Sequence, residues 1–206
     1  MTELHELRLQ TVIEQVLMAQ AKTVLDLGCG QGQLISELAK IDSIEKIVGV
    51  DISATELAIA RDNLNAEGLW FEKDIELIHQ SFDRVNANLI GFDAAIMLET
   101  VEHIEPRYLS RIEHAIFSVY QPRLVIMTTP NVGYNPMYGL QPGETRHPEH
   151  KFEWTRLQFK KWCEGVAVRC NYRVELSSIG EEHLLLGSST QMASFRFLGS
   201  GRPSIV

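Results

Sequence analysis

Long hydrophobic runs and paired cysteines are both missing from this sequence. No stretch of the 206 residues is long and apolar enough to span a bilayer, and the opening MTELHELRLQ is too polar and acidic for a secretory signal. Cys29, Cys163 and Cys170 are odd in number and show neither CxxC nor metal-finger spacing. We therefore expect free thiols in a reducing compartment, a cytoplasmic location and no membrane partner.

Positive charge is scarce as well. Nineteen Lys and Arg against 27 Asp and Glu give a net charge of −8, which argues against a protein that grips long nucleic acid by its phosphates. This balance does not exclude a protein that recognises only a nucleic-acid terminus. Basic residues do gather late in the chain, between Arg146 and Lys161, but charge alone favours a solvated helix face there.

Internal repeats, low-complexity tracts and linkers are also lacking, so the length predicts one domain over residues 1–206. Strand and helix patterns alternate after a leading helix within residues 1–20, which predicts an α/β fold with a single seven-stranded, mostly parallel sheet and helices on both faces. No helix separates the last two strands, so we expect a hairpin at one edge with an antiparallel final strand. The expected strands are 23–27, 46–51, 75–80, 92–98, 123–128, 173–178 and 191–197, and the expected helices are 7–18, 33–40, 55–65, 106–119 and 155–168.

The first expected strand ends in a glycine-rich turn, Asp26-Leu27-Gly28-Cys29-Gly30-Gln31-Gly32. Glycines let the backbone turn sharply and approach a ligand, at the edge of the sheet where α/β proteins bind ligands. The spacing is GxGxG rather than the GxGxxG of dinucleotide-binding proteins. Asp26 would repel a pyrophosphate but suits a cationic amino acid or sulfonium group. Asp51, which closes the second strand, can accept both ribose hydroxyls of a nucleoside.

The strings LDLGCGQG and VGVDIS resemble the first two motifs of Rossmann-like class I methyltransferases. That resemblance implies S-adenosylmethionine as the methyl donor, with the glycine turn at its methionine moiety, the Asp51 position at its ribose and residues 79–82 at its adenine. The expected cofactor-binding residues are Asp26, Gly28, Gly30, Gly32, Asp51, Ser53, Gln80, Ser81 and Leu98.

The fourth expected strand runs into Leu98-Glu99-Thr100-Val101-Glu102-His103. If the chain turns helical there, Glu99, Glu102 and His103 fall at i, i+3 and i+4 and share one face. Two carboxylates and an imidazole suit Mg²⁺ or Mn²⁺. The pair Glu102-His103 also resembles small-molecule methyltransferases, including those of ubiquinone biosynthesis, in which it need not bind metal.

Segments later in the chain favour the metal-binding interpretation of residues 99–103. The segments Thr129-Pro130-Asn131, Tyr134-Asn135-Pro136, residues 146–156 and residues 190–195, together with residues 99–103, resemble the HEN family of small-RNA 3′-terminal ribose 2′-O-methyltransferases. The string HKFEWTR is the most specific piece. Residues 131–153 lack periodicity and predict a long active-site loop.

The HEN resemblance implies a divalent metal, Mg²⁺ or Mn²⁺, held by Glu99, Glu102, His103 and His150, with His147 as the alternative loop histidine. The metal would acidify and align the 2′-hydroxyl. His103, His150 and Glu102 are the expected catalytic residues, with His103 or His150 taking the proton. Phe152 and Trp154 could pack against the terminal base or ribose, or they could be the apolar anchor of the following helix. The expected substrate-binding residues are Asn131, Tyr134, Asn135, Arg146, Lys151, Trp154 and Arg156.

The implied partner is an RNA 3′ end with a free cis diol. Bacterial members of the HEN family often carry an N-terminal domain that couples methylation to an RNA-repair partner, and eukaryotic members carry extra RNA-binding modules. This sequence holds neither, only the short leading helix. Two alternatives remain open at this point: a small-molecule O-methyltransferase acting on a phenol such as a quinone precursor, and a non-catalytic S-adenosylmethionine-binding subunit.

Overall fold

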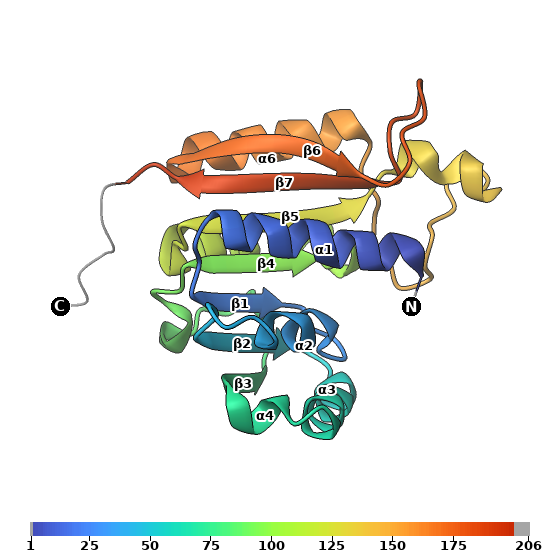
Figure 1. Cartoon of the computed structure of the whole chain (residues 1–206). Helices are drawn as coiled ribbons and strands as arrows, with labels where there is room; N and C mark the ends of the chain where they lie inside the picture. The colour runs from blue at the N-terminus through green and yellow to red at the C-terminus, as the bar shows by residue number, and fades with distance from the viewer. Residues whose placement is uncertain (1, 200–206) are drawn as a thin grey trace.

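A single seven-stranded sheet forms the centre of the computed structural model, which describes residues 2–199 (Figure 1). Residue 1 and residues 200–206, the two ends of the expected domain, lie outside the described residues. The strands lie side by side in the order β3-β2-β1-β4-β5-β7-β6. Their bounds are Thr23–Leu27 (β1), Lys46–Asp51 (β2), Asp74–His79 (β3), Ala94–Leu98 (β4), Leu124–Pro130 (β5), Tyr172–Ile179 (β6) and Thr190–Phe197 (β7).

Strand pairing is parallel from β1 to β5 and antiparallel wherever β7 takes part. The expected mostly parallel sheet and the antiparallel final strand are therefore confirmed. The expected hairpin at one edge is also found: β7 is inserted between β5 and β6 and leaves β6 as the outer strand. This insertion places the connection between β6 and β7 at the end of the sheet where β5 stops.

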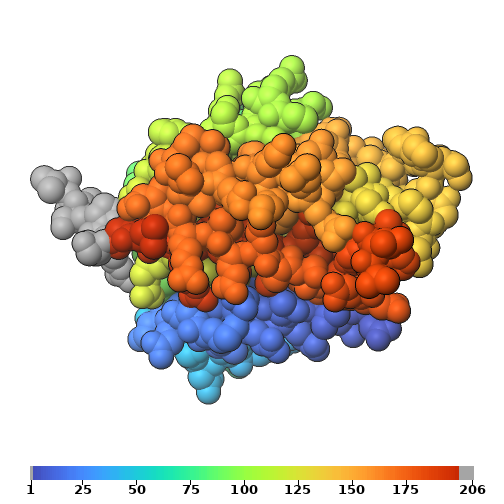
Figure 2. Space-filling model, turned by 90° about the horizontal axis from the view of Figure 1, so that it is seen from above, coloured from blue at the N-terminus to red at the C-terminus, as the bar shows by residue number. Residues whose placement is uncertain are grey.

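Two apolar cores cover the two faces of the sheet, because neighbouring strand residues such as Val24 and Leu25 point to opposite faces. One core contains the helices α1 (Glu3–Met18), α2 (Gln33–Ala39) and α3 (Ala54–Ala66). The other contains α6 (Arg156–Cys170) and the segment 109–120. Viewed from the β6 edge, α1 (blue) lies on one flank of the molecule and the segment that begins near residue 109 (light green) lies on the opposite flank (Figure 2). Helices on both faces are thus confirmed.

The expected helix 106–119 is broken into three pieces: a 3₁₀ turn at Pro106–Tyr108 (η3), α5 at Leu109–Glu113 and a π-helix at His114–Tyr120 (η4). In the π-helical segment, the N–H of Gln121 donates to the carbonyl of Ile116, five residues back. The wider turn accompanies a tyrosine that enters the core, since Tyr120 is 1% exposed and its hydroxyl donates to the carbonyl of Arg84. Apolar periodicity cannot separate π- from α-helical winding over seven residues.

The expected loop 131–153 is partly ordered into 3₁₀ helix. Residues Val132–Tyr138 form η5, whose start is capped by the side chain of Asn131 accepting a bond from the N–H of Gly133. Polar residues and an internal proline hide this element from a search for apolar periodicity. Three further short elements were not expected: α4 (Leu69–Glu72), η1 (Ala87–Leu89) and η2 (Val101–His103). Among the helices of residues 2–199, none is long and apolar enough to cross a membrane.

Candidate functional site

Five parts of the chain meet at the edge where the parallel strands end. The turns after β1 and β4 lie there, and α1 begins at the same edge (Figure 1). The loop 131–153 and the connection between β6 and β7 lie together at this end of the molecule in both views (Figures 1 and 2). Hydrogen bonds join these two segments, since the hydroxyls of Tyr138 and Ser189 lie 2.7 Å apart.

A cavity of about 370 Å³ opens beside the glycine-rich turn. That volume falls within the range of about 300–1,000 Å³ for small-molecule sites. Gly28, Gly30 and Gly32 all have positive φ, and a Cβ on Gly28 would overlap the side chain of Thr100. Only glycine can therefore occupy position 28 without moving the turn. The lining residues are His5, Asp26, Gly28, Cys29, Gly30, Gln31, Gln33, Leu34, Glu56, Leu98 and Glu99.

Two carboxylates near this cavity favour binding of a cationic ligand. Asp51 holds the turn, because its Oδ2 accepts from the N–H of Gly30 at 2.9 Å and its Oδ1 from the N–H of Ser53 at 2.8 Å. Asp26 is buried, and burial followed by the nearby charge of Asp51 raises its pKa to about 7. A carboxyl poised in this way gains charge when a cation binds beside it.

Four of the nine expected cofactor residues line the cavity directly: Asp26, Gly28, Gly30 and Leu98. The other five lie beyond its lining. Gly32 caps the start of α2, Asp51 and Ser53 fix the end of β2, and Gln80 and Ser81 follow β3 with hydrogen bonds to Asn86 and Asp83. His5 of α1 also lines the cavity, although it was not among the expected cofactor residues. The sequence of residues 1–20 gives no sign that the leading helix reaches the ends of the parallel strands.

Three of the four expected metal ligands converge next to the cavity. One ligand atom each from Glu102, His103 and His150 lies within 4.8 Å of the others. Glu102 and His103 come from η2, and the loop brings His150. The N–H of Lys151 donates to the carbonyl of Glu102 at 2.8 Å, which ties the loop to η2. Residues almost fifty positions apart are thereby held together.

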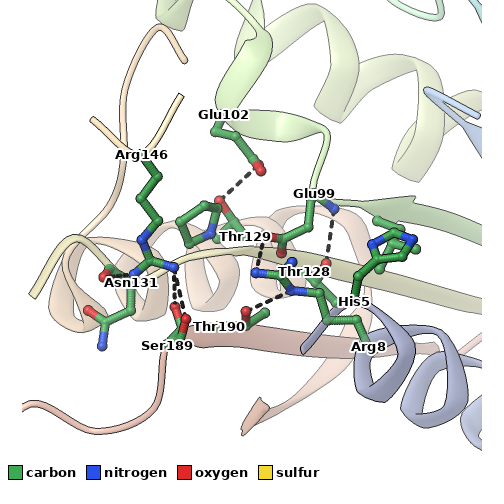
Figure 3. A network of polar contacts seen from close by, with 12 residues as sticks. His5, Arg8, Glu99, Glu102, Thr128, Thr129, Asn131, Arg146, Ser189 and Thr190 are labelled. Atoms are coloured by element: carbon green, nitrogen blue, oxygen red, sulfur yellow. Dashed lines mark hydrogen bonds and ion pairs between the residues drawn. The ribbon is translucent and has the colours of Figure 1, made fainter. Parts of the chain in front are cut away.

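Glu99 lies apart from this group, and the expected arrangement of three residues on one helical turn is not found. The chain leaves β4 with Glu99 at φ 51°, a left-handed conformation that is costly for a residue with a side chain. The 3₁₀ turn begins only at Val101. Instead of joining the cluster, Glu99 pairs with Arg8 of α1, with Oε2 2.8 Å from Nη2 (Figure 3).

Buried oxygens without partners mark the space between these carboxylates. Glu102 is 0% exposed; its Oε2 accepts from Thr129 at 3.0 Å, whereas its Oε1 finds no donor among residues 2–199. Oε1 of Glu99 is buried and equally without a donor in that part of the chain. Burial and then the charge of Glu99 raise the pKa of Glu102 well above its usual value. A divalent cation bound at Glu102 would satisfy its bare Oε1 and remove this conflict.

The histidines complete a donor set that fits such an ion. Burial, followed by the neighbouring His150 and His147, lowers the pKa of His103, so its imidazole is neutral and able to bind a metal near pH 7. Mixed carboxylate and imidazole ligands suit Mn²⁺ and related divalent ions. The residues present therefore fit the expected metal.

Glu153 orients one of these rings and was not among the expected site residues. Its carboxylate lies 2.6 Å from Nδ1 of His150, is 0% exposed, and also accepts bonds from the N–H of Arg146 and the amide of Asn135. Nδ1 is thereby occupied, and Nε2 stays as the ligand atom. His147, the alternative, is exposed, and its Nδ1 accepts from the N–H of Glu149.

Several residues expected to bind the acceptor use their polar groups inside the protein. The guanidinium of Arg146 donates to the side chain of Asn135, the carbonyl of Asn131 and both oxygens of Ser189 (Figure 3). The amide of Asn131 donates to the carbonyl of Ser188. These contacts shape the loop, and a role of Asn131, Asn135 and Arg146 in binding the acceptor stays a prediction.

The remaining expected acceptor residues divide between surface and core. Lys151 and Arg156 are exposed at this end of the molecule, although Arg156 donates to the carbonyl of Leu185. Tyr134 is 8% exposed. Trp154 packs against Phe152 and the α6 residues Phe159 and Trp162, which favours its role as the anchor of that helix.

Comparison with known proteins places this arrangement among methyltransferases. A family profile described as a methyltransferase domain matches residues 24–123. The small RNA 2′-O-methyltransferase of Mus musculus is 33% identical over 98% of this chain and 53% of its own length. This chain therefore spans about half the length of the mouse relative.

Two solved structures extend the likeness over almost the whole chain. The methyltransferase domain of bacterial CtHen1-C superposes with a TM-score of 0.86 at 39% identity, covering 95% of this chain and 99% of that one. The small RNA methyltransferase HEN1 gives a TM-score of 0.88 at 31% identity, covering 98% of this chain and 27% of that one.

Proposed function

The chain belongs to the Hen1 family of methyltransferase domains, and from that premise we propose that it methylates the 2′-hydroxyl of the 3′-terminal ribose of RNA. The methyl donor is S-adenosylmethionine. One observation carries the proposal: Glu102, which has a bare and buried Oε1, clusters with His103 and His150, and it lies three residues after Glu99, which lines the cavity.

The chain's part in holding the donor follows from the cavity. The turn at Gly28 and Gly30 lets the ligand approach the backbone, and the carboxylate of Asp26 faces the cationic amino acid moiety. Asp51 has lone pairs left for ribose hydroxyls while it fixes Gly30. Leu98 and Glu99 line the same cavity at the end of β4, so they would lie against the bound donor.

The chain's part in holding a divalent ion falls to Glu102, His103 and His150, with Glu99 as the fourth ligand once its side chain turns from Arg8. When bound, the ion acts as a Lewis acid toward the vicinal hydroxyls of the terminal ribose. Glu153 fixes the ring of His150, and Thr129 fixes one oxygen of Glu102. Their role is to hold the ligands in one geometry, which supplies the proximity that an in-line transfer needs.

The transfer itself forms a bond between the 2′ oxygen and the methyl carbon, breaks the bond between that carbon and sulfur, and releases S-adenosylhomocysteine. The hydroxyl proton leaves to water at the exposed side of His103. An imidazole whose free lone pair holds a cation cannot also accept a proton. His103, His150 and Glu102 therefore act by positioning, and the need for two adjacent hydroxyls selects RNA ends over DNA ends.

Methyl transfer to matched short RNAs tests the proposal. We expect label from S-adenosylmethionine on an RNA with free 2′- and 3′-hydroxyls, loss of labelling with a 2′-deoxy or 3′-phosphorylated end, and loss with a chelator. Periodate cleaves only a free cis diol, so the product should resist periodate. Glu102→Gln should lower the rate by about 100-fold or more.

Glu105→Gln is the matched control, because this glutamate is exposed and lies three residues further on. It should retain the rate. Glu102→Gln should also unfold at a temperature at least as high as the unaltered protein in chelator, since it removes a buried charge. Labelling of a 2′-deoxy terminus would contradict the proposal. Labelling of catechol with inert RNA would favour the small-molecule alternative. S-adenosylmethionine binding without transfer to any acceptor, together with normal cellular function of Glu102→Ala/His103→Ala, would favour a non-catalytic subunit.

We extend the proposal to location and partner. The three cysteines form no disulfide within residues 2–199, which supports work in a reducing compartment such as the cytoplasm. For the partner, we propose a separate RNA-repair protein that grips RNA beyond the terminus. Co-purification with RNA ligase and end-healing enzymes would test this partner.

A further inference from the structure

Arg8 of the leading helix occupies an unusual position between two strands. Its Nε donates to Oγ1 of Thr190 in β7 at 2.9 Å, and its Nη2 lies 2.8 Å from Oε2 of Glu99 at the end of β4 (Figure 3). Because β5 lies between these strands, the side chain of Arg8 crosses the sheet edge. Its side chain is 13% exposed and that of Glu99 is 18% exposed, so the pair is largely shielded from solvent.

The direction of Glu99 is the feature that needs an explanation. Glu99 is turned toward Arg8, and its ligand atoms lie outside the group formed by Glu102, His103 and His150. Its second oxygen, Oε1, is nevertheless buried without a donor among the residues described. One oxygen of Glu99 is therefore held by Arg8, while the other is free to take a further cationic partner.

We propose that Arg8 is a built-in counter-ion that holds Glu99 outside the metal cluster until a divalent cation enters, and so sets the affinity of the site for that cation. This inference rests on the proposed function only in that a cation binds at Glu102, His103 and His150. Arg8 is a positioning residue: it neutralises Glu99 in the metal-free protein and competes with the cation for the same carboxylate. Its bond to Thr190 keeps the guanidinium in place after Glu99 turns away.

The competition has two measurable consequences. Removing the positive charge frees Glu99 and removes the repulsion between Arg8 and the cation, so binding tightens. The same change leaves Glu99 without a partner in the metal-free protein, so the protein without metal loses stability. A residue with a merely structural role would lower stability without tightening metal binding.

Arg8→Met keeps the apolar stem and removes the charge, and Arg173→Met is the matched control on the exposed outer strand. Binding of Mn²⁺ is measured by titration calorimetry and by the signal of free Mn²⁺ in electron paramagnetic resonance, without RNA. We expect Arg8→Met to bind Mn²⁺ about threefold or more tighter. In chelator its unfolding midpoint should fall by about 3–6 °C. Arg173→Met should change neither.

Arg8→Lys keeps the charge on a side chain that cannot contact Thr190 and Glu99 as a fork, and serves if Arg8→Met fails to fold. It should bind Mn²⁺ with an affinity close to that of the unaltered protein. In the double variant Arg8→Met/Glu99→Gln, the loss of metal-free stability should be smaller than the sum of the single losses.

The outcomes separate this inference from the proposed function. Equal or weaker Mn²⁺ binding by Arg8→Met, with normal binding by the unaltered protein, overturns the role of Arg8 and leaves the proposed function intact. Failure of the unaltered protein to bind Mn²⁺ overturns both the metal in the proposed function and this inference. Tighter binding with no fall in metal-free stability also overturns it, since Glu99 would then not depend on Arg8.

Discussion

Among single residues, the carboxylates around the cavity differ in what compensates their charge. Asp51 accepts two backbone N–H bonds, Glu99 has an arginine, and Glu102 has one threonine hydroxyl. Asp26 is 2% exposed, and the neighbouring charge that shifts its pKa is the negative charge of Asp51. The two least compensated residues, Asp26 and Glu102, lie where the proposed function places cationic ligands. Uncompensated burial is therefore the residue-level signature of this site.

Asp26 should make binding of the donor depend on pH. Its pKa is raised to about 7 by burial, so the carboxyl is largely neutral at pH 6 and largely ionised at pH 8. Because the ionised form attracts the cationic ligand, affinity for S-adenosylmethionine should rise from pH 6 to pH 8, approaching about tenfold per pH unit below the pKa. Titration calorimetry in chelator at pH 6, 7 and 8 measures this.

Asp26→Asn is the control for that pH dependence. It should bind the donor more weakly at pH 8 and show a flatter profile, and its residual slope reports titration of the ligand itself. Equal slopes for the variant and the unaltered protein would remove Asp26 as the titrating group.

The loop 131–153 is the element on which the metal site depends. Asn135, Arg146 and Lys151 bond within the loop, to the β6–β7 connection and to η2, respectively. Glu153 is the centre of this network, because it contacts His150, Arg146 and Asn135 at once. The loop is thus built to present one ring nitrogen at a fixed place.

Glu153→Gln should weaken metal binding without changing the donor cavity. The amide can no longer accept the Nδ1–H bond of His150 with a full negative charge, and loss of such a partner costs about 10–100-fold in metal affinity. Mn²⁺ titration checks this, and S-adenosylmethionine affinity should stay unchanged. Glu149→Gln, an exposed neighbour in the same loop, is the matched control. Unaltered Mn²⁺ affinity in Glu153→Gln would mean that His150 is not a ligand.

Sequence patterns predicted the elements with strong periodicity and missed those without it. The strand ending at Asp26-Leu27 and the glycine turn were evident, because buried strands and positive-φ glycines leave composition signals. The turn at Glu99 was not, because a left-handed glutamate followed by 3₁₀ helix has no such signal. The contact of Arg8 with Glu99 joins residues 91 positions apart and depends on how α1 crosses the sheet. Spacing along one helix cannot reveal it.

At the scale of the molecule, the site gathers at one edge of a domain with a net charge of −8. Helices cover both faces of the sheet, so the edge beyond β1 and β4 is where a ligand can reach the chemistry. Of the late basic residues, Arg146 is used inside the loop, whereas Lys151 and Arg156 are exposed near it. This distribution suits a protein that recognises the end of an RNA strand and makes few phosphate contacts.

Binding of a single-stranded RNA end should therefore depend weakly on salt. Each phosphate contact contributes a slope of about −0.7 to log affinity against log salt for single strands, so two contacts predict a slope of about −1 to −2. Fluorescence anisotropy with a labelled RNA between low and moderate salt measures it. Lys151→Ala and Arg156→Ala should each make the slope shallower by about 0.7, whereas Arg173→Ala, on the outer strand, should leave it unchanged. A steep slope of about −5 would show an extended phosphate-binding surface, which the acidic composition argues against, because the repulsion of a net negative protein weakens rather than strengthens such binding.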